Sequence, residues 1–182
     1  MILFGINFNA YFLLLTRKFK QLFKIEEIRV YLGVIAVFTT LIAFNVRGCF
    51  GSLRESFHHS LFQVASIITT TGFSTVDFNQ WPAFSKLLLV LLMFIGASAG
   101  STGGGIKVTT LSVVLLAVAS VVRGRDEAMI FGRRIDHKTV YKSLTILMLS
   151  LFAVIAASMT LFYNTGPELN EVNSVFEAVS AF

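Results

Sequence analysis

The sequence predicts an all-α membrane protein built from repeated units, each with a spanning helix, a short re-entrant helix and a broken second helix. Of the 182 residues, 55% are hydrophobic and 14% are charged, whereas a soluble domain carries roughly 25% charged residues. Several apolar runs approach the roughly 20 residues that a spanning helix needs, and one run is much shorter. The basic residues gather in two short loops between these runs.

The charge pattern orients the chain and excludes some functions. The net charge is +5, but basic loops between apolar runs mark the cytoplasmic side of a membrane and are not a nucleic-acid signal. The first cluster consists of Arg17, Lys18, Lys20, Lys24 and Arg29, and the second of Arg123, Arg125, Arg133, Arg134, Lys138 and Lys142. The single Cys49 excludes an internal disulfide and a cysteine-based metal site.

The first half of the chain contains one complete span and one short apolar segment. Residues 1–16 form an apolar helix that is short for a full span, and a cytoplasmic loop follows over residues 17–28. Residues 30–46 form the first complete span, and a glycine-broken loop over residues 47–52 lies outside. Residues 57–68 are too few to span, because about 10–14 apolar residues indicate a re-entrant segment. This segment therefore enters the membrane and leaves on the same side.

The apolar run over residues 84–122 is too long for one straight span. At ~1.5 Å per residue it would reach almost twice the ~30 Å hydrocarbon core. A stretch of small residues, which we call the glycine loop (residues 96–105), interrupts it. Two short spans would place the second basic cluster outside, so we predict one span that is broken in its middle. Irregular backbone at membrane depth must be buried in protein or line water, which makes the glycine loop a candidate pore-lining segment.

The second half begins the same unit again. Residues 123–138 form a second cytoplasmic basic loop, residues 139–162 return to the outside, and residues 164–167 form a turn. Residues 171–182 then begin a short amphipathic helix, because their apolar side chains recur at helical spacing. Its position after an outer loop matches that of residues 57–68, which is typical of a repeat architecture.

Candidate ion-binding residues follow the re-entrant helix directly. Successive backbone carbonyls and threonine oxygens can replace the water shell of a cation, and glycine permits the backbone angles that aim such carbonyls at one axis. The C-terminal end of the short helix adds a partial negative charge. The alternative interpretation is a threonine-rich turn between two helices. The candidate residues are Thr70, Thr71, Gly72, Phe73 and Ser74.

The glycine loop has two interpretations, a movable gate of small residues or a close-packed break in a helix. A phosphate-binding loop is disfavoured, because that motif needs Gly-Lys-Ser/Thr and Ile106 separates Gly105 from Lys107. Lys107 either acts on ions as an intramembrane charge or extends its side chain to the inner surface. The candidate gate residues are Gly100, Ser101, Thr102, Gly103, Gly104, Gly105 and Lys107.

The filter-like stretch and the glycine loop together resemble the Trk/Ktr/HKT superfamily of potassium transporters. Residues 69–75, 94–96 and 100–107 carry the resemblance, and residues 130–134 and 176–182 look Ktr-like. Proteins of this superfamily string four helix–pore-helix–helix repeats around a pore. The resemblance implies that residues 29–122 are a complete third repeat, with a pore helix over 57–69, a filter over 70–74 and a broken span over 83–122.

The same resemblance implies that residues 1–16 end the second repeat and residues 139–182 start the fourth, so the chain looks partial. It implies potassium uptake through the filter under control of the glycine loop. Potassium binds at the filter only and is the substrate, sodium is a second candidate, and no cofactor is expected. The implied location is the cell inner membrane or plasma membrane, as a multi-pass protein.

The resemblance also implies partners. These are membrane lipids, a second copy in a full-length homodimer, and a cytosolic nucleotide-binding regulatory subunit of the TrkA/KtrA type. No nucleic acid is expected. The basic loop over residues 123–138 is either a topology signal alone or the docking surface for that subunit.

The sequence also bears on two function classes other than transport. A membrane-embedded enzyme is disfavoured, because no His/Asp/Glu cluster lies inside a span of the sequence. The alternative function is a truncated, non-conducting membrane fragment or an assembly subunit. One filter segment supplies only a quarter of the carbonyls that such a pore needs, so the chain by itself is expected to conduct no potassium.

Overall fold

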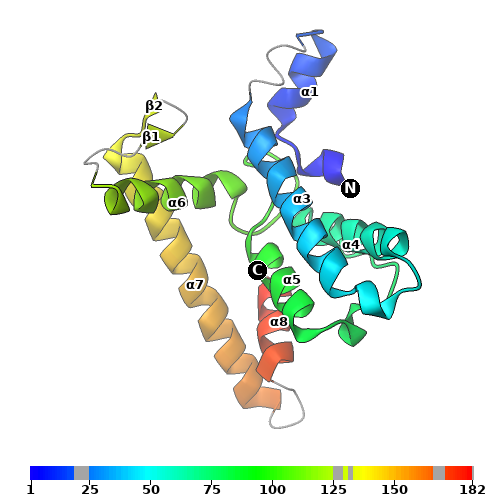
Figure 1. Ribbon diagram of the computed structural model, residues 1–182. Coiled ribbons are helices and arrows are strands. Elements are labelled where there is room, and N and C mark those ends of the chain that lie inside the picture. Colours follow the sequence, from blue (N-terminus) through cyan, green and yellow to red (C-terminus); the bar gives the residue numbers. More distant parts are fainter. Residues whose placement is uncertain (19–24, 125–128, 131–132, 166–170, 182) are drawn as a thin grey trace. The chain divides into compact units, whose positions relative to one another are not determined.

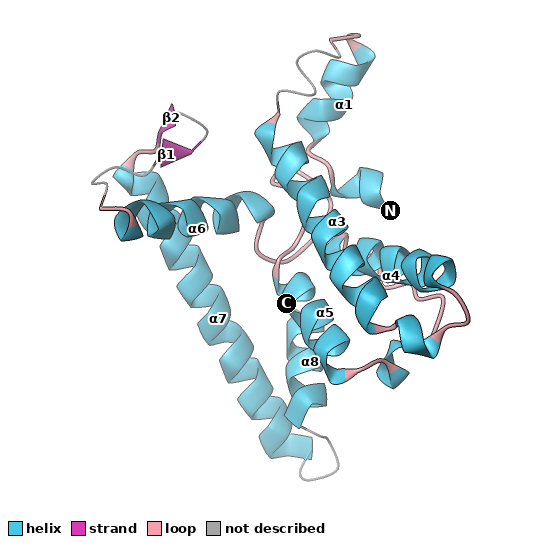
Figure 2. Ribbon diagram, viewed as in Figure 1, coloured by secondary structure: helices cyan, strands magenta, loops and turns pink. Residues whose placement is uncertain are grey.

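The computed structural model describes residues 1–18, 25–124, 129–130, 133–165 and 171–181, and these are mostly helical (Figure 2). The chain divides into two compact units, Met1–Gly105 and Ile106–Phe182, which we describe separately. The charged residues Lys20, Lys24 and Arg125 of the two predicted basic clusters lie outside the described residues, as do residues 166–167 of the predicted outer turn.

The first unit is organised around helices α3 (Glu26–Asn45) and α4 (Leu53–Ile68), which pack against each other after the short turn η2 (Arg47–Cys49) (Figure 1). Helix α3 begins before the predicted span, because Glu26 and Glu27 occupy its first turn, where carboxylates interact favourably with the helix dipole. Helix α4 begins at Leu53 and not at the predicted residue 57. The reason is Ser52, whose hydroxyl accepts a hydrogen bond from Glu55 N at 3.2 Å and caps the helix.

Buried side chains hold α3 and α4 together. Ile35 and Ile42 from α3, and Val64 and Ile68 from α4, form the apolar part of this core. Ser56 adds a polar link, because its hydroxyl donates to the backbone carbonyl of Ala43 at 2.6 Å. A donor and an acceptor that are both buried must pair, so this bond fixes the spacing of the two helices.

Helix α5 (Ala83–Phe94) completes the helical part of the first unit. Ser85 donates to the side-chain oxygen of Asn45 at 2.7 Å and ties α5 to the end of α3. The short turn η3 (Phe78–Gln80) precedes it and is capped by Asp77, which accepts from Asn79 N at 3.0 Å. Trp81 directly precedes the Pro82 cap of α5 and is buried in this unit.

The N-terminal segment differs from the predicted single helix over residues 1–16. It consists of the turn η1 (Ile2–Gly5) and the helix α1 (Phe8–Leu15), separated by Ile6 and Asn7. The break has a local cause, because the Asn7 side chain accepts from Asn9 N at 2.9 Å and caps α1. Tyr31 of α3 also donates to the carbonyl of Ile2 at 3.1 Å. The segment is therefore attached to α3.

The second unit contains α6 (Val108–Val122), strands β1 (Met129–Ile130) and β2 (Arg133–Arg134), α7 (His137–Thr165) and α8 (Glu171–Ala181). The two short strands are antiparallel, with Met129 opposite Arg134 and Ile130 opposite Arg133. Helix α7 packs against α6 and α8. The apolar run over residues 84–122 is not one continuous helix, since helical structure stops at Phe94 and resumes at Val108.

Two of the described helices are long and apolar enough to cross a membrane, at Glu26–Asn45 and His137–Asn164. Helices α5 and α6 are apolar but shorter. Only 11% of the most apolar 18-residue stretch of α7 is buried within the chain. An apolar surface of this size is stable only against lipid or other protein.

Two serines one turn apart on α4 test the α3–α4 packing. Ser56 and Ser60 are both fully buried, but the Ser60 hydroxyl has no hydrogen-bond partner within the described chain, unlike that of Ser56. We expect Ser56→Ala to lower the free energy of unfolding by about 1 kcal/mol. Ser60→Ala should leave it unchanged or raise it, because a buried unpaired hydroxyl is removed. Thermal unfolding of both variants in detergent measures the difference, and equal losses would contradict this assignment.

Candidate functional site

The candidate filter begins where helix α4 ends. Thr71 N donates to Ser66 O at 2.9 Å and Thr70 N donates to Ile67 O at 3.0 Å, which is the Schellman pattern of a helix C-terminus. The pattern requires a left-handed residue in the position that glycine usually takes. Here that residue is Thr70, with φ of 53°. A β-branched residue at positive φ is a genuine outlier, and such outliers persist where the surrounding structure or a function imposes them.

The residues after Thr70 are exposed and lack regular secondary structure. Every residue of the candidate filter, 70–74, is solvent-exposed in this chain, and Phe73 is 66% exposed. Gly72 has φ of 79° with open space around it. Its conformation is therefore set by the backbone and not by crowding, and any side chain there is strained.

Side chains hold the candidate filter at both ends. At the inner end, the Thr69 hydroxyl donates to Ala65 O at 2.7 Å and lies 2.7 Å from the Thr71 hydroxyl. At the outer end, His59 Nδ1 lies 2.9 Å from the Thr75 hydroxyl, and the His59 ring stacks on Phe50 with centroids 5.0 Å apart. The sequence alone predicts only a solvated helix start at His59, and the contact with Thr75 depends on the tertiary structure.

The glycine loop folds back on itself. A Cβ atom on Gly96 would overlap the carbonyl oxygen of Gly104, and one on Gly103 would lie 2.7 Å from Ala97 Cβ. Two backbone segments approach this closely only where side chains are absent. The small residues of the loop are thus required by its own packing.

The loop also contacts the candidate filter. Gly104 N donates to the Thr70 hydroxyl at 3.2 Å. The structure therefore brings residues 70–74 and residues 100–105, which the sequence singled out separately, together at one contact. Lys107 falls in the second unit, where it directly precedes α6 and is half-buried.

Three further segments supply partners for the backbone of the loop. Ala99 N donates to a Glu27 carboxylate oxygen at 2.6 Å. Ser98 N donates to Gly5 O at 3.2 Å, and Phe8 N donates to Gly100 O at 3.1 Å. Backbone groups of an irregular segment need such partners inside a membrane. The N-terminal segment and the start of α3 thus support the loop, which the sequence did not indicate.

Two polar side chains of α4, Gln63 and Ser66, lie on one face of the helix, which on sequence alone predicts hydrogen bonds from helix to helix. In the part of the chain that it describes, the structure does not show these bonds for the oxygen atoms of either side chain. Both are buried, but the Gln63 side-chain oxygen and the Ser66 hydroxyl have no hydrogen-bond partner among the described residues.

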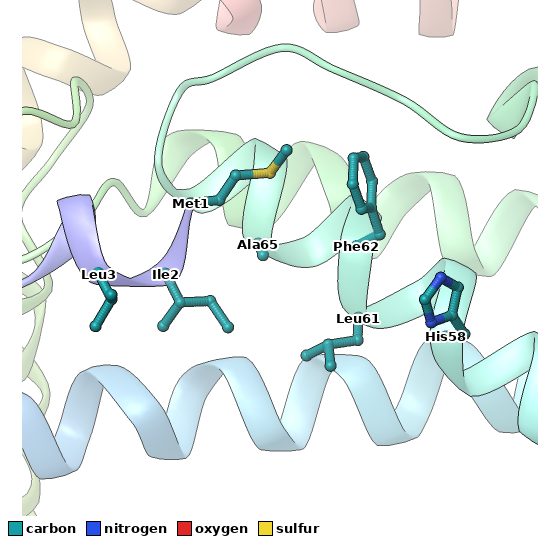
Figure 3. A pocket seen from close by; sticks show the side chains of 7 residues that line it. All are labelled: Met1, Ile2, Leu3, His58, Leu61, Phe62 and Ala65. Carbon is teal, nitrogen blue, oxygen red and sulfur yellow. The ribbon is translucent and has the colours of Figure 1, made fainter.

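A separate hollow of about 460 Å³ lies between α4 and the N-terminal segment (Figure 3). Figure 3 shows side chains from both segments around it. Its lining consists of Met1, Ile2, Leu3, His58, Leu61, Phe62 and Ala65. The surface is apolar apart from the His58 imidazole and contains none of the candidate filter or gate residues. We therefore do not assign it to the site.

Comparison with known proteins identifies the family. The family model described as "TrkH: Cation transport protein" matches residues 4–182. An uncharacterised cation transporter of Mycoplasma genitalium is 37% identical over 68% of this chain and 20% of its own length. The Ktr system potassium uptake protein B of Bacillus subtilis is 32% identical over 98% of this chain and 41% of its own length.

A solved structure shares the fold. The crystal structure of the potassium transporter TrkH from Vibrio parahaemolyticus matches 98% of this chain and 40% of its own chain, with a TM-score of 0.83 and 22% identity. The chain thus spans less than half the length of these relatives. The fold is that of a helical membrane transport protein. The chain belongs to the TrkH family of cation transport proteins, which are not enzymes.

A pair of glycine variants tests the packing of the loop. Gly96→Ala places a Cβ against the Gly104 carbonyl, and we expect a loss of roughly 1–3 kcal/mol in the free energy of unfolding, as for overpacked cores. Gly104→Ala is the control, because its Cβ would lie at an ordinary 3.5 Å from Thr70 Cγ2. Thermal unfolding in detergent compares the two. A Gly104→Ala variant that is as unstable as Gly96→Ala would show that the close approach is not required.

Proposed function

We propose that this chain takes part in potassium uptake across the plasma membrane or inner membrane, with residues 70–74 as part of a selectivity filter and the glycine loop as its gate. The observation that carries the proposal is the hydrogen bond from Gly104 N to the Thr70 hydroxyl. This bond joins the irregular glycine loop to Thr70, the first residue of the exposed, threonine-rich stretch over residues 70–74. The names of the relatives and the family assignment favour potassium as the transported ion.

The filter role follows from the chemistry of residues 70–74. Two threonines and an unhindered glycine offer oxygen ligands, which suit a hard cation that must give up its water. The stretch begins at the C-terminus of α4, where the helix carries partial negative charge. Its exposure in this chain leaves these groups accessible. Four such segments around one axis complete a filter, so we assign conduction to the intact transporter that contains these residues.

The gate role follows from the position of the glycine loop. Its residues Gly100, Ser101, Thr102, Gly103, Gly104 and Gly105 carry small side chains or none, so little packing is lost when they move. In the structure the loop contacts the inner end of the filter through Gly104. A segment in this place obstructs an ion that leaves the filter until it moves aside. Lys107 directly follows the loop in the sequence, and we include it in the proposed gate as an intramembrane charge.

The proposal includes substrate and partners. Potassium is the substrate and sodium the second candidate, without a cofactor. Membrane lipids cover the exposed apolar helices, and the full-length protein forms a homodimer. The basic loop over residues 123–138 is proposed as the docking surface of a cytosolic nucleotide-binding regulatory subunit of the TrkA/KtrA type.

Gly72 and Gly124 form a matched pair that tests the filter. Both have positive φ, at 79° and 67°, and both lie in open space. Serine at either position costs roughly 1–2 kcal/mol of backbone strain, but only Gly72 lies among the proposed ligands. We expect Gly72→Ser to lower the ratio of K⁺ to Na⁺ uptake several-fold in the intact transporter, and Gly124→Ser to leave it unchanged. Ion uptake by a potassium-uptake-deficient bacterial strain measures the ratio, and an unchanged ratio in Gly72→Ser would remove residue 72 from the filter.

A further inference from the structure

Glu27 is the acidic side chain on which three segments of the first unit meet. One carboxylate oxygen accepts from Ala99 N in the glycine loop at 2.6 Å. The other accepts from Asn7 Nδ2 in the N-terminal segment at 3.1 Å. Glu27 itself lies in the first turn of α3 and is half-buried. Hydrogen bonds to a carboxylate are roughly twice as strong as those between neutral groups.

The orientation of Asn7 is fixed by a second bond. Its side-chain oxygen accepts from Asn9 N at 2.9 Å, so its amide nitrogen must face Glu27. The direction of each hydrogen bond is therefore fixed. Asn9 N donates to the Asn7 side-chain oxygen, the Asn7 amide nitrogen donates to Glu27, and Ala99 N also donates to Glu27. The neighbouring residue Phe8 bonds to the loop directly, through its backbone N and Gly100 O at 3.1 Å.

The loop connects this cluster to the filter. Ala99 lies at one end of the contact surface and Gly104 at the other, where Gly104 N donates to the Thr70 hydroxyl. The loop is closed on itself by the approach of Gly104 to Gly96, which precedes Ala99 in the chain. A loop packed in this way moves as one piece, so a restraint on Ala99 also restrains Gly104.

We propose that Glu27 and Asn7 form a latch that holds the glycine loop against the filter and keeps the gate closed; the gating part of this inference rests on the proposed function. Both are positioning residues, since neither contacts the filter. Release of the Ala99 N–H leaves the loop attached through weaker, neutral bonds at Ser98, Gly100, Thr102 and Gly104. The sequence places Glu27 among basic residues of a cytoplasmic loop, whereas the structure assigns it to the gate.

A swap of donor and acceptor tests the latch. In Glu27→Gln the side-chain oxygen of residue 27 still accepts from Ala99 N. The new NH₂ group of residue 27 then faces the NH₂ group of Asn7, so two donors oppose each other. In Asn7→Asp two carboxylates face each other and repel. The double variant Asn7→Asp/Glu27→Gln restores one donor and one acceptor, keeps the α1 cap and has the same net charge as the wild type. Glu26→Gln is the control, because Glu26 is the other carboxylate in the first turn of α3.

Hydrogen exchange of the Ala99 amide is the primary readout, measured by mass spectrometry on the intact transporter in nanodiscs. We expect each single variant to raise the exchange rate about tenfold, as for loss of a charge-assisted bond. The double variant should lower the rate again towards that of the wild type but not fully, because Ala99 N then donates to a neutral amide oxygen. Glu26→Gln should not change the rate. Additive effects in the double variant, or equal effects of Glu26→Gln and Glu27→Gln, would overturn the latch.

Basal potassium flux without the regulatory subunit is the second readout. We expect Asn7→Asp to raise this flux and the double variant to lower it again towards the wild-type level. If the exchange rate of the Ala99 amide changes in the variants as expected but the basal potassium flux does not, the contact is structural and the gating role is refuted. If the wild-type transporter carries no potassium, the proposed function fails, and the exchange measurement still decides whether the latch exists.

Discussion

The polar backbone of the glycine loop has to find hydrogen-bond partners in the middle of an apolar run, and this requirement organises the first unit. A helix would satisfy these groups internally, but helical structure stops at Phe94. The partners come instead from Glu27, from the backbone of Gly5 and Phe8, and from the Thr70 hydroxyl. Because unpaired backbone groups are costly away from water, the N-terminal segment, the start of α3 and the filter are held in place by the loop that they support.

The same contacts connect the two parts of the proposed site. The filter begins with a threonine in a conformation that glycine usually takes, and the hydroxyl of that threonine accepts from the loop. The loop, in turn, is restrained at its other side by a carboxylate. A change at the start of α3 can therefore reach the first residue of the proposed filter through one compact segment. This connection would give the proposed gate a physical means of responding to events at that end of the helix.

The sequence predicted those features that depend on local pattern. Apolar length and charge asymmetry indicated the spans and the broken helix, and the threonine-glycine stretch after a short helix indicated the candidate filter. Local capping was partly missed, because Ser52 extends α4 towards the N-terminus and Asn7 divides the first helix. The fold class is confirmed by the shared fold of the solved transporter structure, whereas the roles of residues 70–74 and of the glycine loop stay predictions.

Long-range contacts explain the rest of what the sequence did not show. Glu27 and Ala99 are 72 positions apart, and nothing in the residues around Glu27 distinguishes it from a carboxylate that offsets a basic cluster. The contact of His59 with Thr75 likewise depends on how the chain returns past α4 after the filter. Contacts between residues far apart in the sequence are set by the tertiary structure. The periodicity and composition of the sequence therefore do not predict them.

The claim that the loop must leave the filter before ions pass can be tested with one engineered disulfide. A Cβ on Gly104 would lie 3.5 Å from Thr70 Cγ2, so Thr70→Cys/Gly104→Cys brings two thiols within bonding range. Replacing Cys49, the single cysteine of this sequence, by alanine removes one competing thiol, and any cysteine elsewhere in the intact transporter is replaced in the same way. Potassium flux through the intact transporter is then measured in proteoliposomes before and after reduction. Flux that is absent in the oxidised form and appears on reduction is the predicted result, whereas equal flux in both forms would contradict a gate at this contact.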